Sequence, residues 1–124
     1  MQYLSKEQIV AATDVKTIDI AIPEWGGTVR VKNLTALERE QFIRDTQEKK
    51  LDLSRTKIAW VARCLVDEQG RPIFSEGEVE LLGAKSAKAL DRVVDAIESI
   101  NALTAESLGE IGKNLLGTPK SSSN

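Results

Sequence analysis

The sequence predicts an α+β fold, mainly helical, in which an N-terminal β-hairpin packs on a bundle of four to five α-helices. Three observations predict it: two short segments in which apolar and polar residues alternate, a glycine pair between them, and later segments with apolar residues at helical spacing. The 124 residues are 41% hydrophobic and 29% charged, as in a globular protein with one modest core. We expect residues 1–116 to form this single domain and residues 117–124 to form a flexible tail.

The two predicted strands lie within residues 18–31. Isoleucine occupies every second position of the first strand and valine every second position of the second, so each strand has one apolar face. The residues of this shared face are Ile18, Ile20, Ile22, Val29 and Val31. Since Pro23 has no N–H to donate to a sheet, we expect the first strand to be an edge strand or to be bulged there.

A glycine pair, Gly26-Gly27, predicts the turn of the hairpin. Two adjacent glycines adopt positive φ angles without steric cost, which a two-residue turn of the primed type requires. This turn sets the register of the ladder, with Trp25 facing Thr28 and Ile22 facing Val31.

Most helix starts are marked by a polar cap that is followed three residues later by Glu or Gln, each satisfying a backbone donor near the other. The pairs are Ser5–Gln8, Thr35–Glu38 and Ser75–Glu78. We expect these helices to run to about residues 12, 49 and 83. Apolar periodicity predicts a central helix over residues 53–66 and a longer helix over residues 86–101. Thr104 caps a final helix, which Gly109 and Gly112 weaken.

The sequence offers little catalytic chemistry. It contains no histidine, the most common general acid–base group and transition-metal ligand. No nucleophile, base and orienting group occur together, so we expect no catalytic, cofactor or metal site and a protein that is not an enzyme. The single cysteine, Cys64, lies in an apolar segment and is predicted to be a buried structural thiol.

Residues 67–78 have the length of a calcium-binding loop. Arg71 stands where the loop needs an oxygen ligand, and Pro72 stands where it needs glycine. We therefore interpret this stretch as a polar turn that leads through Ile73-Phe74 into the Ser75 cap.

Charge and targeting signals name no partner. The net charge is −2, without a block of like charge, so nothing favours nucleic acid or a membrane surface. The N-terminus lacks the features of an export signal, and no apolar run reaches membrane-spanning length. With a single cysteine, this pattern favours a reducing cytoplasm.

Two tryptophans stand out in a chain with 4% aromatic residues. Trp25, at the hairpin tip, either folds back as a cap on the core or is exposed as an anchor for a partner. Trp60 is predicted to be a core residue of the central helix. The candidate partner-binding residues are Trp25 and, on the final helix, Leu108, Ile111 and Leu115.

Four segments, taken in order, resemble the tail assembly chaperones of long-tailed, siphovirus-type bacteriophages and prophages. They are IPEWGGTVRV at residues 22–31, LTALER at 34–39, ARCLVDEQGRPIF at 62–74 and LGAKSAKALDR at 82–92. None is a catalytic signature, so the likeness rests on their joint order. It covers most of residues 5–105.

The resemblance implies a non-catalytic protein of the host bacterial cytoplasm that binds and solubilises the tape-measure protein during tail assembly. Such a protein self-associates and is absent from the mature virion. It also implies that this chain is the short form, and that a longer form made by ribosomal frameshifting recruits tail-tube protein.

Two other functions remain open at the level of the sequence. One is a small phage structural protein, a head–tail connector or tail-completion protein, that stays in the virion. The other is a small DNA-binding regulator that uses the helix pair over residues 35–49 and 53–66, although the second of these looks buried and the chain is not basic.

Overall fold

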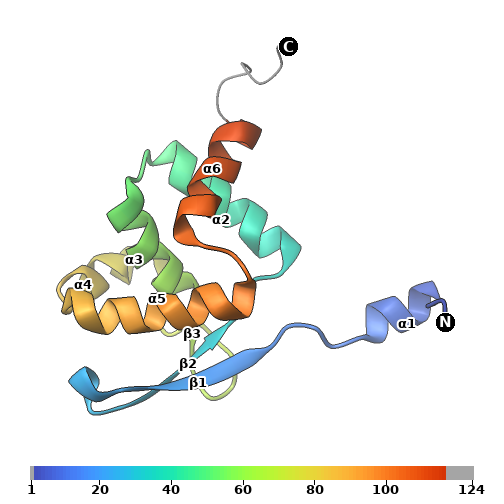
Figure 1. The fold of residues 1–124 in the computed structure, drawn as a ribbon, viewed down its shortest axis with the longest axis horizontal. Coiled ribbons are helices and arrows are strands. Elements are labelled where there is room, and N and C mark those ends of the chain that lie inside the picture. The colour runs from blue at the N-terminus through green and yellow to red at the C-terminus, as the bar shows by residue number, and fades with distance from the viewer. Residues whose placement is uncertain (1, 117–124) are drawn as a thin grey trace.

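The computed structural model describes residues 2–116, with the backbone alone for residues 112–116. Within this range the protein has the α+β fold that the sequence predicts, with a hairpin below a group of helices (Figure 1). The elements are α1 (Lys6–Ala11), β1 (Thr17–Ile22), the 3-10 turn η1 (Pro23–Trp25), β2 (Gly27–Lys32), α2 (Ala36–Glu48), α3 (Leu53–Cys64), β3 (Leu65–Val66), the 3-10 turn η2 (Glu76–Glu78), α4 (Val79–Gly83), α5 (Ala87–Asn101) and α6 (Ala105–Leu116). The flexible tail predicted over residues 117–124 lies outside the described residues.

The predicted hairpin is present, but its turn and register differ from the prediction. Pro23 begins the 3-10 turn η1, which the Gly26 N–H closes by donating to the Pro23 carbonyl over 3.1 Å. Gly26 alone of the glycine pair has a positive φ, +73°. As a result Ile22 pairs with Gly27, and Val31 pairs with Ile18 rather than with Ile22.

This correction leaves the apolar face unchanged. The partner of Val31 moves along β1 by an even number of residues, from 22 to 18, and side chains in a strand alternate with a period of two. The isoleucines of β1 and the valines of β2 therefore still share one face. The strand order β1-β2-β3 also places β1 at an edge of the sheet, as Pro23 predicted.

The third strand was not predicted. The sequence pattern extends the central helix to residue 66, whereas α3 ends at Cys64 and Leu65–Val66 form β3. Val31 and Arg30 of β2 pair with these two residues in antiparallel register. Both β3 side chains are buried in a sheet, so their apolar character fits a strand as well as a helix.

The core lies between the sheet and the helices. Helix α5 lies along the apolar face of the hairpin, and α3 packs against α5 on the side away from the sheet (Figure 1). Helices α2 and α6 pack against each other above α3. Trp60 and Val61 of α3 and Val93 and Ile97 of α5 are fully buried. Trp60 is thus a core residue, as predicted, and its ring stacks on Phe42 with the ring centroids 6.4 Å apart.

The helix starts predicted from these caps are present. The Ser5 and Thr35 hydroxyls each accept from the N–H three residues later, and their own N–H groups donate to the side chains of Gln8 and Glu38. At Ser75 the N–H donates to the Glu78 side chain over 2.9 Å, and the Glu78 N–H donates to the Ser75 carbonyl over 3.0 Å. Ser86 and Thr104 cap α5 and α6 with their hydroxyls. Helix α1 differs from the others because it buries no residue and lies apart from the domain (Figure 1).

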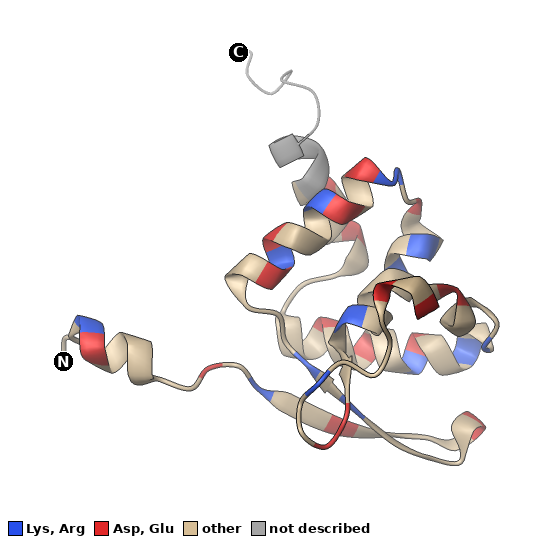
Figure 2. Cartoon of the chain, turned by 180° about the vertical axis from the view of Figure 1, so that it is seen from behind, with Lys and Arg blue, Asp and Glu red and all other residues tan. Residues whose placement is uncertain are grey.

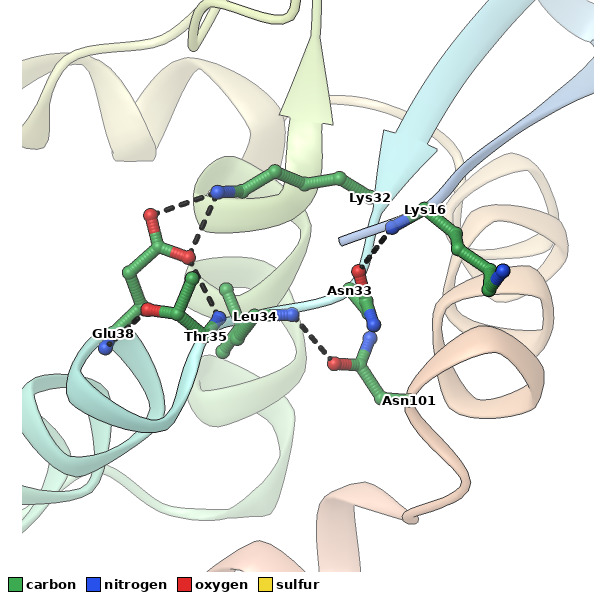
Figure 3. A network of polar contacts seen from close by, with 7 residues as sticks. All are labelled: Lys16, Lys32, Asn33, Leu34, Thr35, Glu38 and Asn101. Atoms are coloured by element: carbon green, nitrogen blue, oxygen red, sulfur yellow. Dashed lines mark hydrogen bonds and ion pairs between the residues drawn. The ribbon is translucent and has the colours of Figure 1, made fainter. Parts of the chain in front are cut away.

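A polar network after β2 joins distant parts of the chain (Figure 3). The Lys32 ammonium donates over 2.7 Å to Glu38, the partner of Thr35 in the capping box of α2. The Leu34 N–H donates to the Asn101 side chain at the end of α5 over 2.9 Å. The Lys16 N–H donates to the Asn33 side chain over 2.7 Å. These bonds fix α2, α5 and the segment before β1 relative to the hairpin.

Candidate functional site

The structure separates the four candidate partner-binding residues. Trp25 is partly buried against the core, on the rim of a surface groove. Leu108 is 2% exposed and belongs to the core between α6 and its neighbours. Ile111 is partly buried against the same core. Leu115 lies in α6, in the part for which side chains are not described. Trp25 is therefore the candidate with a described surface site beside it.

This site, which we call the Trp25 groove, is an open hollow of about 480 Å³ at the hairpin tip. Its walls come from the hairpin, β3, the segment before the Ser75 cap, α4, and the link between α4 and α5. The lining residues are Glu24, Trp25, Val29, Leu65, Ile73, Phe74, Leu82 and Lys85. Six of the eight are apolar, and the two charged residues have opposite signs.

Local sequence explains how each wall is positioned. The turn η1 redirects the chain after β1, so that Trp25 is partly buried against the core rather than extended from the tip. The Ile73 N–H donates to the Leu65 carbonyl over 3.2 Å, which holds the segment carrying Ile73 and Phe74 against β3. Leu82 of α4 is buried and closes the floor. The sequence left two roles open for Trp25, a cap on the core and an exposed anchor. In the structure its side chain packs against the core and also lines a surface groove.

Ion pairs hold the hairpin tip in place. The Arg92 guanidinium of α5 donates to both carboxylate oxygens of Glu24, over 3.0 and 3.1 Å. The pKa of the Glu24 carboxyl lies below its usual range, chiefly because it accepts a hydrogen bond from its own backbone N–H, and further because of Arg92 and nearby Lys88. Glu24 therefore stays charged and tied to α5 at neutral pH. The tip, with Trp25, is fastened to the longest helix of the domain.

The groove contains apolar surface that the fold does not bury. The Ile73 side chain on its wall is 47% exposed, and Leu81, which lies outside the groove, is 58% exposed. Exposed apolar residues that line a concave surface are typical of protein-binding sites, whereas single exposed ones are common everywhere. The groove therefore fits an apolar side chain or a short apolar segment better than a polar ligand.

The sequence prediction missed the other walls of this site. Ile73 and Phe74 were recognised only as a short extended segment, and Lys85 only as part of a motif. Their position depends on the contact of β3 with β2, which no local pattern predicted. The one signal was the pair of apolar residues directly after a polar turn, which suggests a segment returning to the domain.

A second hollow of about 340 Å³ lies between α2, α3 and the segment before α4. Its floor includes Phe42, Ala59 and Ala62, and two ion pairs lie on its rim. They join Arg63 to Asp45, and Lys49 to Glu76. The Arg63 guanidinium also lies over the Phe42 ring, 5.6 Å from its centroid. Because the charged side chains on its rim already pair with one another, we regard this hollow as a space between packed helices and not as a binding site.

The residues considered for chemistry have structural roles. Cys64 is fully buried, and burial raises the pKa of its thiol to about 12, so it is not a nucleophile at neutral pH. The Asp67 carboxylate accepts from the Gln69 and Arg71 N–H groups over 2.8 and 3.0 Å. Residues 67–71 thus form the predicted polar turn. No group of three or more potential ligands among the described residues could hold a metal ion.

Charges are spread over the surface of the described chain. Figure 2 shows Lys and Arg interspersed with Asp and Glu on the helices, without a large surface of one sign. Among the described residues, no helix combines the length and the apolar character that crossing a membrane requires.

Comparisons of the chain with protein-family models, with curated proteins and with solved structures found no match. The likeness to tail assembly chaperones therefore rests on the four sequence motifs alone.

Proposed function

We propose that this protein is a tail assembly chaperone of a long-tailed phage or prophage. In this proposal it binds the tape-measure protein in the host cytoplasm, keeps it soluble until tail-tube subunits enclose it, and is absent from the mature virion. A longer form made by frameshifting recruits the tail-tube protein.

One observation carries the proposal. All eight residues that line the Trp25 groove come from three of the four segments that resemble tail assembly chaperones, namely residues 22–31, 62–74 and 82–92. Residues 22–31 are separated from the other two segments by about 30 residues and need not have met them at one surface. Their convergence on an apolar groove supports a binding role for the features that make up the resemblance.

The chemistry of the groove suits this partner. A long helical protein that has not yet been enclosed exposes apolar stripes, which favour aggregation. A groove of this size accepts one or two large side chains from such a stripe, so a single contact is weak. Many copies bound along the same chain provide avidity while each contact stays reversible.

The test is co-expression with the tape-measure protein of the same phage, followed by measurement of the soluble, co-purifying fraction. We expect a soluble complex. Replacing Ile73 with Glu places a charge on the groove wall and should reduce the affinity at least about tenfold. Leu81→Glu is the matched control, because Leu81 is at least as exposed as Ile73 but lies outside the groove, and the variant should bind as the wild type does.

Two outcomes would overturn the proposal. A tape-measure protein that stays insoluble and unbound, beside a folded chaperone, argues against any complex. Detection of this chain by mass spectrometry in purified virions would favour the structural-protein alternative, a head–tail connector or tail-completion protein. Equal loss of binding in Ile73→Glu and Leu81→Glu would exclude the Trp25 groove as the site.

A further inference from the structure

Strand β1 presents an open edge. It is the outer strand of the sheet, and its six residues pair with β2 on one side and with no other strand of the described chain. Four of the six are β-branched, which favours further strand pairing. An edge of this length exposes backbone N–H and C=O groups and is a template for another strand.

The chain does not cover this edge itself. The segment before β1, residues 2–13, extends away from the domain, and its residues are exposed (Figure 1). Its base is held in place by Asn33, whose side chain accepts from the Lys16 N–H (Figure 3). The same side chain donates to the Asp14 carbonyl over 3.3 Å. The Asn33 N–H also donates to the Lys16 carbonyl over 3.1 Å. The segment is thereby directed past the end of the strand rather than along its side.

The usual protection of an edge strand is missing here. Natural edges carry a lysine, a proline or an unpaired inward charge that prevents association. Within β1 the one charged residue is Asp19, which the Arg30 guanidinium neutralises over 2.7 and 3.1 Å. Pro23 lies beyond the end of the strand.

We propose that two copies of this chain associate through β1, antiparallel to β1 of the second copy, to form one continuous six-stranded sheet. The argument for a second copy is the symmetry of the strand. Isoleucine occupies positions 18, 20 and 22, so the apolar face reads the same in both directions about Ile20. A strand with this pattern is complementary to itself.

The register follows from charge. A two-fold axis normal to the sheet keeps both apolar faces on the same side, so Asp19 or Ile20 can lie on the axis. With Asp19 on the axis, the two carboxylates would face each other, which is unfavourable. With Ile20 on the axis, Ile18 faces Ile22 of the second copy, and Asp19 faces Ala21 of the second copy. This register also brings the Lys16 end of each strand to the Glu24 end of the other.

The arrangement uses apolar surface that the monomer leaves exposed. Ile18 is 36% exposed, whereas the other apolar residues on this face of the hairpin are buried or partly buried, and pairing covers it. Strand pairing alone buries less than the roughly 1,200 Å² of a standard stable interface. Antiparallel pairing carries each N-terminal segment past the hairpin tip of the other copy. There the exposed side chains of Tyr3, Leu4, Ile9 and Val10 can add to the buried area.

The first test measures the monomer–dimer equilibrium of the full chain by analytical ultracentrifugation. We expect a concentration-dependent dimer. Ile18→Lys introduces an edge-blocking charge and should raise the dissociation constant at least about tenfold. Leu37→Lys is the control, because Leu37 is 78% exposed on α2 and away from the edge, and it should leave the dimer unchanged. A strictly monomeric wild type, or a dimer insensitive to Ile18→Lys, would overturn the proposal.

The second test examines the register. In a Cys64→Ala background, a cysteine in place of Ile20 should form an intermolecular disulfide under mild oxidation, because it faces its own copy across the axis. Thr28→Cys on β2 is the control and should not cross-link. Cross-linking that is stronger at Asp19→Cys than at Ile20→Cys would contradict the proposed register.

The dimer does not depend on the Trp25 groove, so the Ile73→Glu variant should lose tape-measure binding and still dimerise.

Discussion

The side-chain amide of Asn101 joins the end of α5 to the link between β2 and α2. Its Nδ2 donates to the Ile97 carbonyl and its Oδ1 accepts from the Leu34 N–H, each over 2.9 Å. The amide therefore fastens the last turn of α5 to the link between β2 and α2 (Figure 3). An asparagine near the end of a helix is common enough that the sequence does not reveal this role.

Asn101→Ala should lower the free energy of unfolding by about 1–3 kcal/mol, because the partly buried Leu34 N–H loses its acceptor. Chemical denaturation measures the change. Ser99→Ala, an exposed position on the same helix, serves as the control and should change stability by less than about 0.5 kcal/mol. A loss for Asn101→Ala no larger than for the control would mean that water replaces the amide.

Cys64 shows the opposite case, a residue whose role follows from the sequence. Its apolar surroundings predicted burial, and the structure confirms it, with the pKa of the thiol raised to about 12 mainly by burial. Because the thiolate is the reactive form, the folded protein should react with a thiol reagent at pH 8 orders of magnitude more slowly than the unfolded protein. A colorimetric thiol assay with and without denaturant measures the ratio. Comparable reaction rates with and without denaturant would show that the C-terminal end of α3 opens readily in the folded protein.

At the scale of elements, helix starts were predicted well and helix ends less well. A capping box is contained within four residues, so the sequence carries the whole signal. The end of α3 depends instead on the pairing of Leu65 and Val66 with β2. In the same way, Gly26 was recognised as a turn residue and Pro23 only as a sign of an edge or bulged strand, while the 3-10 turn that they form together determined the register.

Helix α6 forms despite the glycines that were expected to weaken it, because Leu108 is buried and the helix packs against α2 and α3. At Gly109 an added Cβ would have no heavy atom within 4 Å, apart from neighbouring helix backbone. Gly109→Ala should therefore raise the free energy of unfolding by about 0.5–1 kcal/mol. Titration of the wild type and the variant with denaturant measures this difference in the free energy of unfolding.

Gly26→Ala provides the comparison for this substitution. An added Cβ at Gly26 also has open space around it, but the residue has a φ of +73°. The backbone strain should lower stability by about 1–2 kcal/mol. An equal change at both positions would show that helix propensity does not explain the gain at Gly109.

At the scale of the whole molecule, carboxylates accept hydrogen bonds at several separate places, some of which join different elements. The pKa values of four of them, Asp19, Glu24, Glu38 and Asp67, are lowered. For Glu38, partial burial alone would raise the pKa, but hydrogen bonds from Lys32 and the Thr35 N–H outweigh it. A carboxylate with a lowered pKa stabilises the fold above its pKa in the unfolded chain and loses this effect as the pH falls through its folded value.

The free energy of unfolding should therefore be nearly constant above about pH 5 and fall steadily below about pH 4.5. Denaturation series from pH 7 to about pH 3 measure this dependence. Glu38→Gln removes one carboxylate with a lowered pKa and should reduce the slope of the free energy of unfolding against pH below about pH 4.5. Glu48→Gln, at an exposed position that makes no ion pair with the described residues, should leave the slope unchanged. If the wild type, Glu38→Gln and Glu48→Gln all showed the same dependence of stability on pH, the role assigned to the Lys32–Glu38 pair would be contradicted.

The candidate site also belongs to this scale. Trp25 was identified from the sequence because a large aromatic residue at a hairpin tip is unusual. Leu108 and Ile111 were chosen for an apolar helix face, and that face is used inside the domain. Periodicity indicates that a face is apolar but not which surface covers it. Ile73 and Phe74 join the groove only through the contact of their segment with β3.

The sequence by itself determined the α+β class, the helix starts, the apolar face of the hairpin, and the buried state of Cys64 and Trp60. Each of these depends on residues within a few positions of one another, through caps or periodicity. Only the tertiary structure decided the third strand, the Asn101 tie and the Trp25 groove. These depend on groups dozens of residues apart, whose meeting is fixed by the packing of the whole chain. The hairpin register is a local feature, but it follows from the 3-10 turn that Pro23 and Gly26 form together, which the glycine pair alone did not predict.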